Sequence, residues 1–188
     1  TEANNGLEEA NVELDGSHPA LPPTTLFDFS DNKGHYEFNA VPFLGDYTVT
    51  PVKDNDPLNG VSTFDLVLIN KHILGLEPLN SPYKMIGADA NNSRSITTFD
   101  IVELRKLILG IYTELPNNTS WRFVDASYSF PNPANPFQEI FPETKQIASM
   151  LNNTTGQNFV AQKVGDVNGN AVASSLVTSD DRTSGTLL

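Results

Sequence analysis

Two stretches of this chain carry the same sequence pattern at a constant offset. Residues 54–76 read DNDPLNGVSTFDLVLINKHILGL, and residues 89–111 read DANNSRSITTFDIVELRKLILGI, so equivalent positions are 35 residues apart without a gap. Between 63–76 and 98–111, 8 of 14 aligned residues are identical. Such self-similarity indicates one supersecondary unit that is used twice. Each copy begins with oxygen-bearing side chains at alternate positions and continues into an apolar helical pattern.

The alternating oxygens of each copy fit a 12-residue cation-binding loop. In such a loop, positions 1, 3, 5, 7, 9 and 12 surround a Ca²⁺ ion, and position 7 uses its backbone carbonyl. The carboxylate at position 12 stands at the start of the following helix, where the helix dipole also favours negative charge. In the second copy the predicted ligand positions are Asp89, Asn91, Ser93, Ser95, Thr97 and Asp100. In the first copy they are Asp54, Asp56, Leu58, Gly60, Ser62 and Asp65.

Both copies depart from the standard EF-hand loop. Position 12 is Asp instead of Glu, and position 6, which is normally Gly, is Asn59 or Arg94. Leu58, at position 5 of the first copy, offers only its backbone. We expect these departures to lower the affinity for Ca²⁺, whereas the duplication strengthens the prediction of two sites.

A loop that ends in Asp and leads into one helix, repeated once, resembles the type I dockerin repeat. The resemblance covers 54–111 and implies two Ca²⁺-loaded loop–helix units that are related by a pseudo-twofold axis. It also implies a cohesin domain as the partner, and the residues that would meet it are Thr63, Phe64, Thr98 and Phe99. Over a longer range, the sequence is similar to modules of very large secreted surface proteins of Bacteroidota, in which the module lies between β-rich domains.

Composition and charge exclude several classes of function. The 188 residues include 23 Asp and Glu against 11 Lys and Arg, and the resulting net charge of −12 repels nucleic acid phosphates. No apolar run approaches the roughly 18 residues of a membrane span. The absence of Cys excludes disulfides, zinc–thiolate sites and cysteine nucleophiles. The predicted loops account for several of the carboxylates.

Residues 1–53 have the pattern of β structure. Strands are predicted at 11–14, 26–29, 36–39 and 46–52, which alternate in polarity or are rich in β-branched and aromatic residues. The stretch from 31 to 51 resembles the end of a prealbumin-like, carboxypeptidase-regulatory or Cna-B-type β-sandwich. Because such sandwiches have about seven strands, we expect a missing strand to come from sequence upstream of Thr1 or from a neighbouring molecule.

Two amphipathic helices follow the predicted loops. The first is predicted over 62–76 and the second over about 98–109, and Gly75 and Gly110 are the expected stops. Between them, Ser81-Pro82 is a start signal for a short turn of helix.

Residues 112–173 are predicted to form a β and loop cover that packs on the helix pair. Strands are expected at 121–130 and 158–164, and a short helix is expected at 142–151. The aromatic residues of the first of these strands need a core in which to be buried. Residues 174–188 are predicted to be a linker that leads into a next domain.

The sequence GDVNGN at 165–170 is a third, partial loop. Asp166, Asn168 and Asn170 occupy positions 1, 3 and 5, but neither a helix pattern nor a carboxylate at position 12 follows. One carboxylate and two amides are too few ligands for Ca²⁺. The segment is therefore either a plain turn or a third Ca²⁺ site whose shell is completed by other parts of the chain.

No catalytic constellation is evident in the sequence. The three histidines lie in separate regions, and no Ser/His/Asp order is indicated. Asp125, Glu139 and Glu143 could serve a glycosidase, but no spacing singles out two facing carboxylates. We therefore predict that the chain is not an enzyme.

These patterns together predict an α+β chain with a partial β-sandwich over 1–53, a duplicated Ca²⁺-loop–helix pair over 54–111 and the cover over 112–173. The predicted function is a non-enzymatic, calcium-stabilised structural or adhesive segment of a large extracellular surface protein. Its partners would be neighbouring domains of the same chain or neighbouring molecules. One alternative is a dockerin module that docks onto a cohesin, and another is an ancillary domain of a secreted hydrolase.

The exposure of two phenylalanines distinguishes the first two functions. Phe64 and Phe99 occupy loop position 11 in the two copies. Exposure of both would mark a docking patch, whereas burial of both would make the helix pair a rigid joint between domains. We expect burial, because the cover and the N-terminal β region carry enough apolar residues to enclose them.

Overall fold

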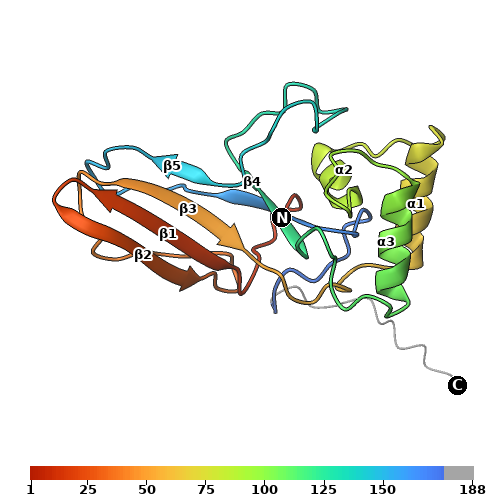
Figure 1. Ribbon diagram of the computed structural model, residues 1–188, viewed down its shortest axis with the longest axis horizontal. Coiled ribbons are helices and arrows are strands. Elements are labelled where there is room, and N and C mark those ends of the chain that lie inside the picture. The colour runs from red at the N-terminus through yellow and green to blue at the C-terminus, as the bar shows by residue number, and fades with distance from the viewer. Residues whose placement is uncertain (176–188) are drawn as a thin grey trace, which may run out of the picture.

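The computed structural model describes residues 1–175 and has an α+β fold with two antiparallel sheets, neither of which closes. The larger sheet has the strand order β2-β1-β3-β5, and the smaller pairs β4 with β6. The larger sheet forms one end of the molecule, α1 and α3 form the other, and β4 lies between them (Figure 1). The elements are β1 (Asn11–His18), β2 (Leu21–Phe29), β3 (Asp46–Val52), α1 (Thr63–Ile73), α2 (Pro82–Ala88), α3 (Thr98–Ile108), β4 (Trp121–Asp125), β5 (Lys145–Ile147) and β6 (Phe159–Lys163).

The larger sheet is amphipathic because its central strands alternate in polarity. Val12 and Leu14 of β1 are buried beside Tyr47 and Val49 of β3, and Met150 packs against the same cluster. The intervening residues of both strands face the other side of the sheet and are more exposed. This alternation is the period of two that a sheet with one buried face requires.

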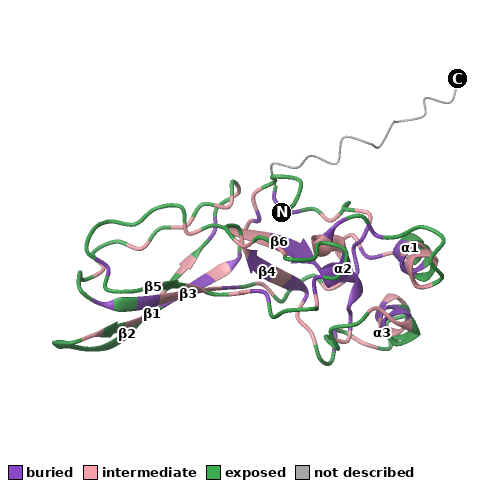
Figure 2. Cartoon of the chain, turned by 90° about the horizontal axis from the view of Figure 1, so that it is seen from above, coloured by how far each residue is buried: buried purple, intermediate pink, exposed green. Residues whose placement is uncertain are grey.

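The fourth strand of the larger sheet comes from within the chain. Residues Lys145–Ile147 form β5, which pairs antiparallel with β3 through Thr48 and Gln146. The short helix predicted at 142–151 is therefore wrong, since part of this segment is a strand. The strand expected from upstream of Thr1 or from a neighbouring molecule stays a prediction. The opposite edge strand, β2, is largely exposed (Figure 2).

Residues 36–39 are not a strand, contrary to the prediction from their alternating pattern. The backbone N–H of Glu37 donates to the carboxylate of Asp28 at 2.7 Å, so a side chain takes the place of a ladder partner. Tyr36 and Phe38 still pack against the core of the larger sheet, in edge-to-face contact with each other. Burial of their rings, without strand pairing, explains the apolar alternation of this segment.

The helices begin and end where local sequence signals predict. α1 and α3 start after the N-cap residues Ser62 and Thr97, each with a complete capping box, and α2 starts at Pro82. Gly75 and Gly110 follow the C-termini of α1 and α3 with φ angles of 67° and 68°. This left-handed conformation ends the two helices at equivalent positions.

The core beneath α1 and α3 includes residues from the far end of the described chain. Ile69, Leu104 and Leu107 of the two helices are at most 1 % exposed, and they share one cluster with Val164 and Val167. The segment that follows β6 is thus part of the helical core.

The residues predicted as a cover pack on both ends of the molecule. Trp121 and Phe123 of β4 are buried against Leu7 and Ala10, which precede the larger sheet. β4 and β6 therefore link the larger sheet to the helices instead of covering the helices alone.

No helix within residues 1–175 is long and apolar enough to cross a membrane. Of the predicted linker at 174–188, only two residues lie in the described part of the chain. Ser174 is buried, and the backbone N–H of Ser175 donates to the carboxylate of Glu8 at 2.7 Å. The prediction for 176–188 falls outside the described residues.

Candidate metal centre

The loop 89–100 is folded around two buried carboxylates, of which Asp89 is the first. Asp89 is 1 % exposed. Its Oδ1 accepts a hydrogen bond from the backbone N–H of Ser93 at 2.9 Å, and its Oδ2 accepts one from the N–H of Arg94 at 2.8 Å. Asn91 Oδ1 also accepts from the N–H of Ser93, at 3.0 Å. The side chains of Asp89 and Asn91, at positions 1 and 3, thereby fix the backbone at positions 5 and 6.

Asp100 is the second carboxylate, and it closes the loop from the first turn of α3. It is fully buried, and its Oδ1 accepts from the backbone N–H of Asn91 at 3.1 Å. Its Oδ2 accepts from the N–H of Thr97 at 2.8 Å, as the capping box of α3 requires. The position-12 side chain therefore reaches both halves of the loop.

The electrostatics of this loop favour a bound cation. Burial raises the pKa of Asp89, and the nearby negative charge of Asp100 raises it further. Among residues 1–175, no ion pair joins either carboxylate to Lys, Arg or His. Buried charges in proteins are normally paired with an opposite charge or coordinated to a metal. Arg122 lowers the pKa of Asp89 from a longer distance, but neither carboxylate has a basic side chain of the described residues in direct contact.

The backbone of the loop has the conformation that position 6 of an EF-hand loop needs. Arg94 has φ 62°, in the left-handed region that favours glycine, and Asn92 at position 4 has φ 57°. The guanidinium of Arg94 turns away from the carboxylates and donates to the carbonyl of Phe137 at 2.7 Å. The hydrogen bonds that Arg94 donates, from its backbone N–H to Asp89 and from its guanidinium to Phe137, offset the cost of a non-glycine residue there.

The oxygens of this loop are a mixed donor set. No group of three or more His, Cys, Asp or Glu side chains within residues 1–175 is close enough to hold a metal ion by itself. Any ion here would combine two carboxylates with amide, hydroxyl and backbone carbonyl oxygens. Ser93 Oγ already lies 3.3 Å from the carbonyl oxygen of Ser95, so these two groups converge. Ca²⁺ accepts such mixtures, whereas thiolate- or imidazole-based sites are absent from this loop.

The structure does not bring the predicted ligands of the first copy together. Asp54 and Asp56 are exposed, whereas Asp65 is fully buried. Asp54 Oδ1 accepts from the backbone N–H of Ser120 at 2.7 Å, which holds it on the cover. Leu58, at predicted position 5, is 47 % exposed. The first half of the predicted loop at 54–65 thus lies apart from its second half.

Asp65 instead contacts the partial loop near the end of the described chain. Its Oδ1 accepts from the backbone N–H of Val167 at 3.0 Å and from that of Asn168 at 3.2 Å. Asp166 is only 2 % exposed, and burial raises its pKa, with Asp65 adding a smaller effect in the same direction. The partial loop at 165–170 is therefore in contact with the N-terminus of α1.

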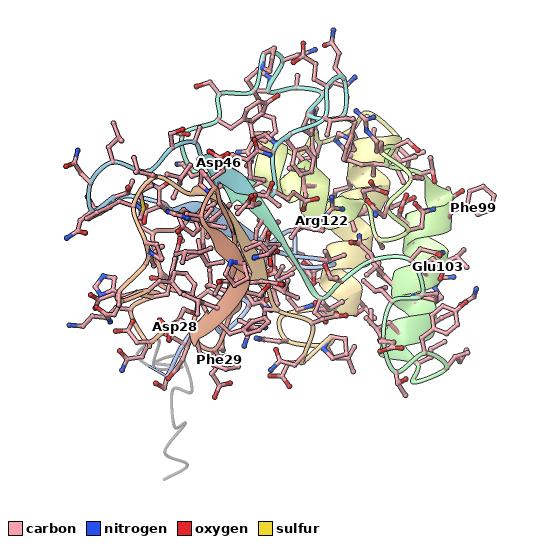
Figure 3. All side chains as sticks on the ribbon, turned by 60° about the vertical axis from the view of Figure 1, so that its left-hand side comes forward. Asp28, Phe29, Asp46, Phe99, Glu103 and Arg122 are labelled. Carbon is pink, nitrogen blue, oxygen red and sulfur yellow. The ribbon has the colours of Figure 1, made fainter. Side chains whose placement is uncertain are left out.

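The expected burial of Phe64 and Phe99 is wrong. Phe64 is 58 % exposed and Phe99 is 71 % exposed. Figure 3 shows Phe99 extending from α3 away from the rest of the chain. The aromatic residues of β4 that were expected to cover them, Trp121 and Phe123, are buried against the N-terminal segment. The two phenylalanines, with the exposed Thr63 and Thr98 beside them, each lie in the first turn of their own helix.

An open apolar groove between α1 and α3 continues this exposed surface. Its volume is about 550 Å³, and the lining residues include Leu66, Val67, Leu74, Ile101 and Leu109. Leu74 and Leu109 are 61 % and 66 % exposed at equivalent positions of the two helices. The sequence carries a signal for this surface, because both helices have apolar residues beyond those needed for one buried stripe.

Comparison of the chain with protein-family models, with curated proteins and with solved structures found no match. Function is therefore inferred from the loops and the helix surface described above.

Proposed function

We propose that this chain is a non-enzymatic, calcium-stabilised structural module of a large extracellular surface protein. In this proposal, residues 54–111 contribute a loop–helix pair of the dockerin type, and the larger sheet is part of a β-sandwich. The Ca²⁺ ion at 89–100 would be held by Asp89 and Asp100, with Asn91, Ser93, Ser95 and Thr97 completing the shell.

The observation that carries this proposal is the pair of buried carboxylates at 89–100. Asp89 and Asp100 are almost completely removed from water, and no basic side chain of residues 1–175 forms an ion pair with either of them. Two like charges in such an environment repel each other, and both are costly to desolvate. The attraction of a divalent cation to both carboxylates would offset this repulsion and this desolvation cost. The surrounding neutral oxygens would complete a shell of the size that Ca²⁺ uses.

A structural role is supported by the continuity of the molecule between its two ends. The backbone N–H of Trp121 donates to the carbonyl of Lys53 at 3.2 Å, where β3 leads toward the helices. Ser120 is held by Asp54 immediately beside this contact. Apolar residues on both sides of this junction are buried, so the ends of the molecule are joined by a packed region and not by a free linker.

A calcium titration of the intact 188-residue chain tests the proposal. We expect the heat of binding at 89–100 to disappear in Asp89→Asn, which removes the charge but keeps the shape. The matched control is Asp15→Asn, because Asp15 is an exposed carboxylate on β1. Binding that is identical in all three proteins, or absent from the parent, would contradict the proposal.

Docking onto a partner is a second candidate function, and the exposure of Phe64 and Phe99 favours it. Exposed large aromatic side chains and an open apolar groove are typical of interaction sites. The resemblance to dockerins implies a cohesin domain as the partner. In this case the calcium-bound loops would fix the two helices and, with them, the positions of both phenylalanines.

Binding to a panel of cohesin domains tests this second candidate. Measurable binding that is lost in Phe64→Ser and Phe99→Ser would support docking, provided that both variants retain the melting temperature of the parent. Glu103→Ser is a control at a half-buried, polar position of the same helix. Absence of binding to every cohesin would leave the structural role as the function that the geometry supports.

A further inference from the structure

We propose that a second Ca²⁺ ion is bound by a discontinuous loop, whose first half is 166–171 and whose second half is 60–65. This site rests on the proposed function, since it uses the same cation and the same chemistry as the loop 89–100. It differs from the contiguous loop predicted at 54–65, because it excludes Asp54 and Asp56 and joins two segments that are far apart in the sequence.

The first half of this discontinuous loop repeats the hydrogen bonds of the intact loop. Asp166 Oδ1 accepts from the backbone N–H of Asn170, at position 5, with a distance of 3.3 Å. Asp166 Oδ2 accepts from the N–H of Ala171, at position 6, with a distance of 2.7 Å. Asn168 Oδ1, at position 3, accepts from the N–H of position 5 at 3.0 Å. Asp89 and its loop make the same three contacts.

The second half supplies the position-12 carboxylate with the same two contacts that Asp100 makes. Asp65 Oδ1 accepts from the backbone N–H of Asn168, at position 3, with a distance of 3.2 Å. Asp65 Oδ2 accepts from the N–H of Ser62, at position 9, with a distance of 3.0 Å. Asp65 thus joins two halves that are about a hundred residues apart in sequence, whereas Asp100 joins two halves of one continuous segment.

The two halves meet where Ala171, at position 6 of the first half, lies against Gly60, at position 7 of the second half. A Cβ atom added to Gly60 would lie 2.6 Å from the Cα atom of Ala171. Gly60 also has φ 73°, so both the close approach and the backbone angle require glycine here. Position 4 is left-handed in both loops, with φ 82° at Gly169 and φ 57° at Asn92. A chain break between positions 6 and 7 is the main difference between the two loops.

The charges in this discontinuous loop point to a cation independently of its hydrogen bonds. Asp65 and Asp166 are 0 % and 2 % exposed, and within residues 1–175 neither is in an ion pair with a basic side chain. Lys163 is buried nearby, but its ammonium donates to the carbonyls of Pro57 and Val164 instead of to either carboxylate. Lys163 and Asp166 therefore attract each other only over a longer distance, and buried carboxylates without a cation in direct contact are the situation in which proteins bind metals.

The donor set of the discontinuous loop suits Ca²⁺. Asp166 and Asp65 supply carboxylates, Asn168 and Asn170 supply amide oxygens, and Gly60 stands at the position of the backbone carbonyl ligand. Oxygen ligands of this number and kind match a flexible Ca²⁺ shell. The exposed carboxylates of the 54–56 segment, by contrast, lie outside this arrangement. The ion would therefore link the segment 166–171, near the C-terminal end of the described chain, to the N-terminus of α1.

Calcium stoichiometry in the full chain tests this assignment. We expect two ions for the parent, one for Asp166→Asn, and two for the controls Asp54→Asn and Asp56→Asn. Because Asp166 is buried, the exposed variant Asn170→Ala provides a second test that does not depend on a core substitution. It should weaken one of the two ions while the circular dichroism spectrum of the calcium-saturated protein stays unchanged.

Backbone hydrogen exchange locates the ion. Addition of Ca²⁺ should slow the exchange of the N–H groups of Val167 and Asn168, and Asp166→Asn should remove that effect while leaving the effect at 89–100. Loss of one ion in Asp54→Asn, or two ions in Asp166→Asn, would overturn the discontinuous site. A parent that binds one ion, lost in Asp89→Asn, would also overturn it but leave the proposed function standing. A parent that binds none would contradict both.

Discussion

The side chain of Asn59 pairs with the backbone of Val172 through two hydrogen bonds. Asn59 Nδ2 donates to the carbonyl of Val172 at 2.8 Å, and Asn59 Oδ1 accepts from its N–H at 2.9 Å. The contact lies between the segment that leads into α1 and the segment that follows β6, next to the contact of Gly60 with Ala171. It therefore connects residue 59 with residue 172 in the folded state and helps to offset the entropy that is lost when so long a loop is closed.

Asn59→Ala should destabilise the chain and weaken the discontinuous site. Loss of two hydrogen bonds at a partly exposed position should cost about 1–2 kcal/mol in the free energy of unfolding. The affinity of one Ca²⁺ ion should fall, whereas that of the ion at 89–100 should not change. Urea denaturation and calorimetric titration measure these two effects. Equal weakening of the binding of both ions would show that Asn59 acts on the whole module and not only on the discontinuous site.

Phe64→Ala and Phe99→Ala should leave stability nearly unchanged. Substitutions of exposed residues usually change the free energy of unfolding by about 0.5 kcal/mol or less. Leu104→Ala is the matched core variant, because Leu104 is fully buried in the same helix pair, and it should cost about 2–5 kcal/mol. Thermal melts of the three variants in saturating Ca²⁺ provide the measurement. A large loss of stability in either phenylalanine variant would mean that the side chain is covered in solution.

Calcium affinity should fall when the pH is lowered from about 7 to about 5, a range close to the titration of carboxylates. Burial raises the pKa of Asp89 and of Asp166 in the calcium-free protein, so protons compete with Ca²⁺ at a higher pH than for ordinary carboxylates. Without calcium, these raised pKa values contribute stability below the unfolded pKa, and that contribution is lost as the pH rises. The gain in stability from calcium should therefore grow with pH. Titrations at several pH values that give one constant affinity would contradict this.

Stability at alkaline pH should depend on Lys163. Burial lowers the pKa of Lys163 to about 8, although Asp166, Asp54 and Asp56 oppose the shift. Between this value and the ordinary lysine pKa, the unfolded chain binds a proton that the folded chain has released, so stability rises with pH across that window. The gain should be on the order of 3 kcal/mol or less. Denaturant melts in saturating Ca²⁺ should show this rise in the parent, and Lys163→Met should abolish it.

Local sequence signals predicted α1 and α3, but they could not predict the contact between Asp65 and the segment 166–171. Serine and threonine caps, position-12 aspartates and C-terminal glycines act within a few residues, and α1 and α3 follow them closely. The 35-residue repeat aligns 54–59 with 89–94 because the helices that follow are alike. In the structure, segment 166–171 stands in that place instead, and only the tertiary fold brings it there.

Two defects in the sequence were complementary signals for this arrangement. The copy at 54–65 has Leu58 at a ligand position, and the partial loop at 165–170 has three good ligands but no position-12 carboxylate. The partial loop supplies an oxygen side chain at position 5, where the copy at 54–65 has Leu58. That copy in turn supplies the carboxylate at position 12, which the partial loop lacks. The strand β5 gave no comparable signal, since three residues are too few for a period, and its conformation is set by pairing with β3.

The melting temperature of the intact chain in saturating Ca²⁺ and in excess EDTA tests the calcium-stabilised module most directly. At a free Ca²⁺ concentration about 100 times the dissociation constant, one site adds about 2.7 kcal/mol to the folded state. For a chain of this size, each kcal/mol corresponds to roughly 2–4 °C. We therefore predict that EDTA lowers the melting temperature by at least about 5 °C and that added Ca²⁺ restores it, whereas equal melting temperatures in the two solutions would contradict the account.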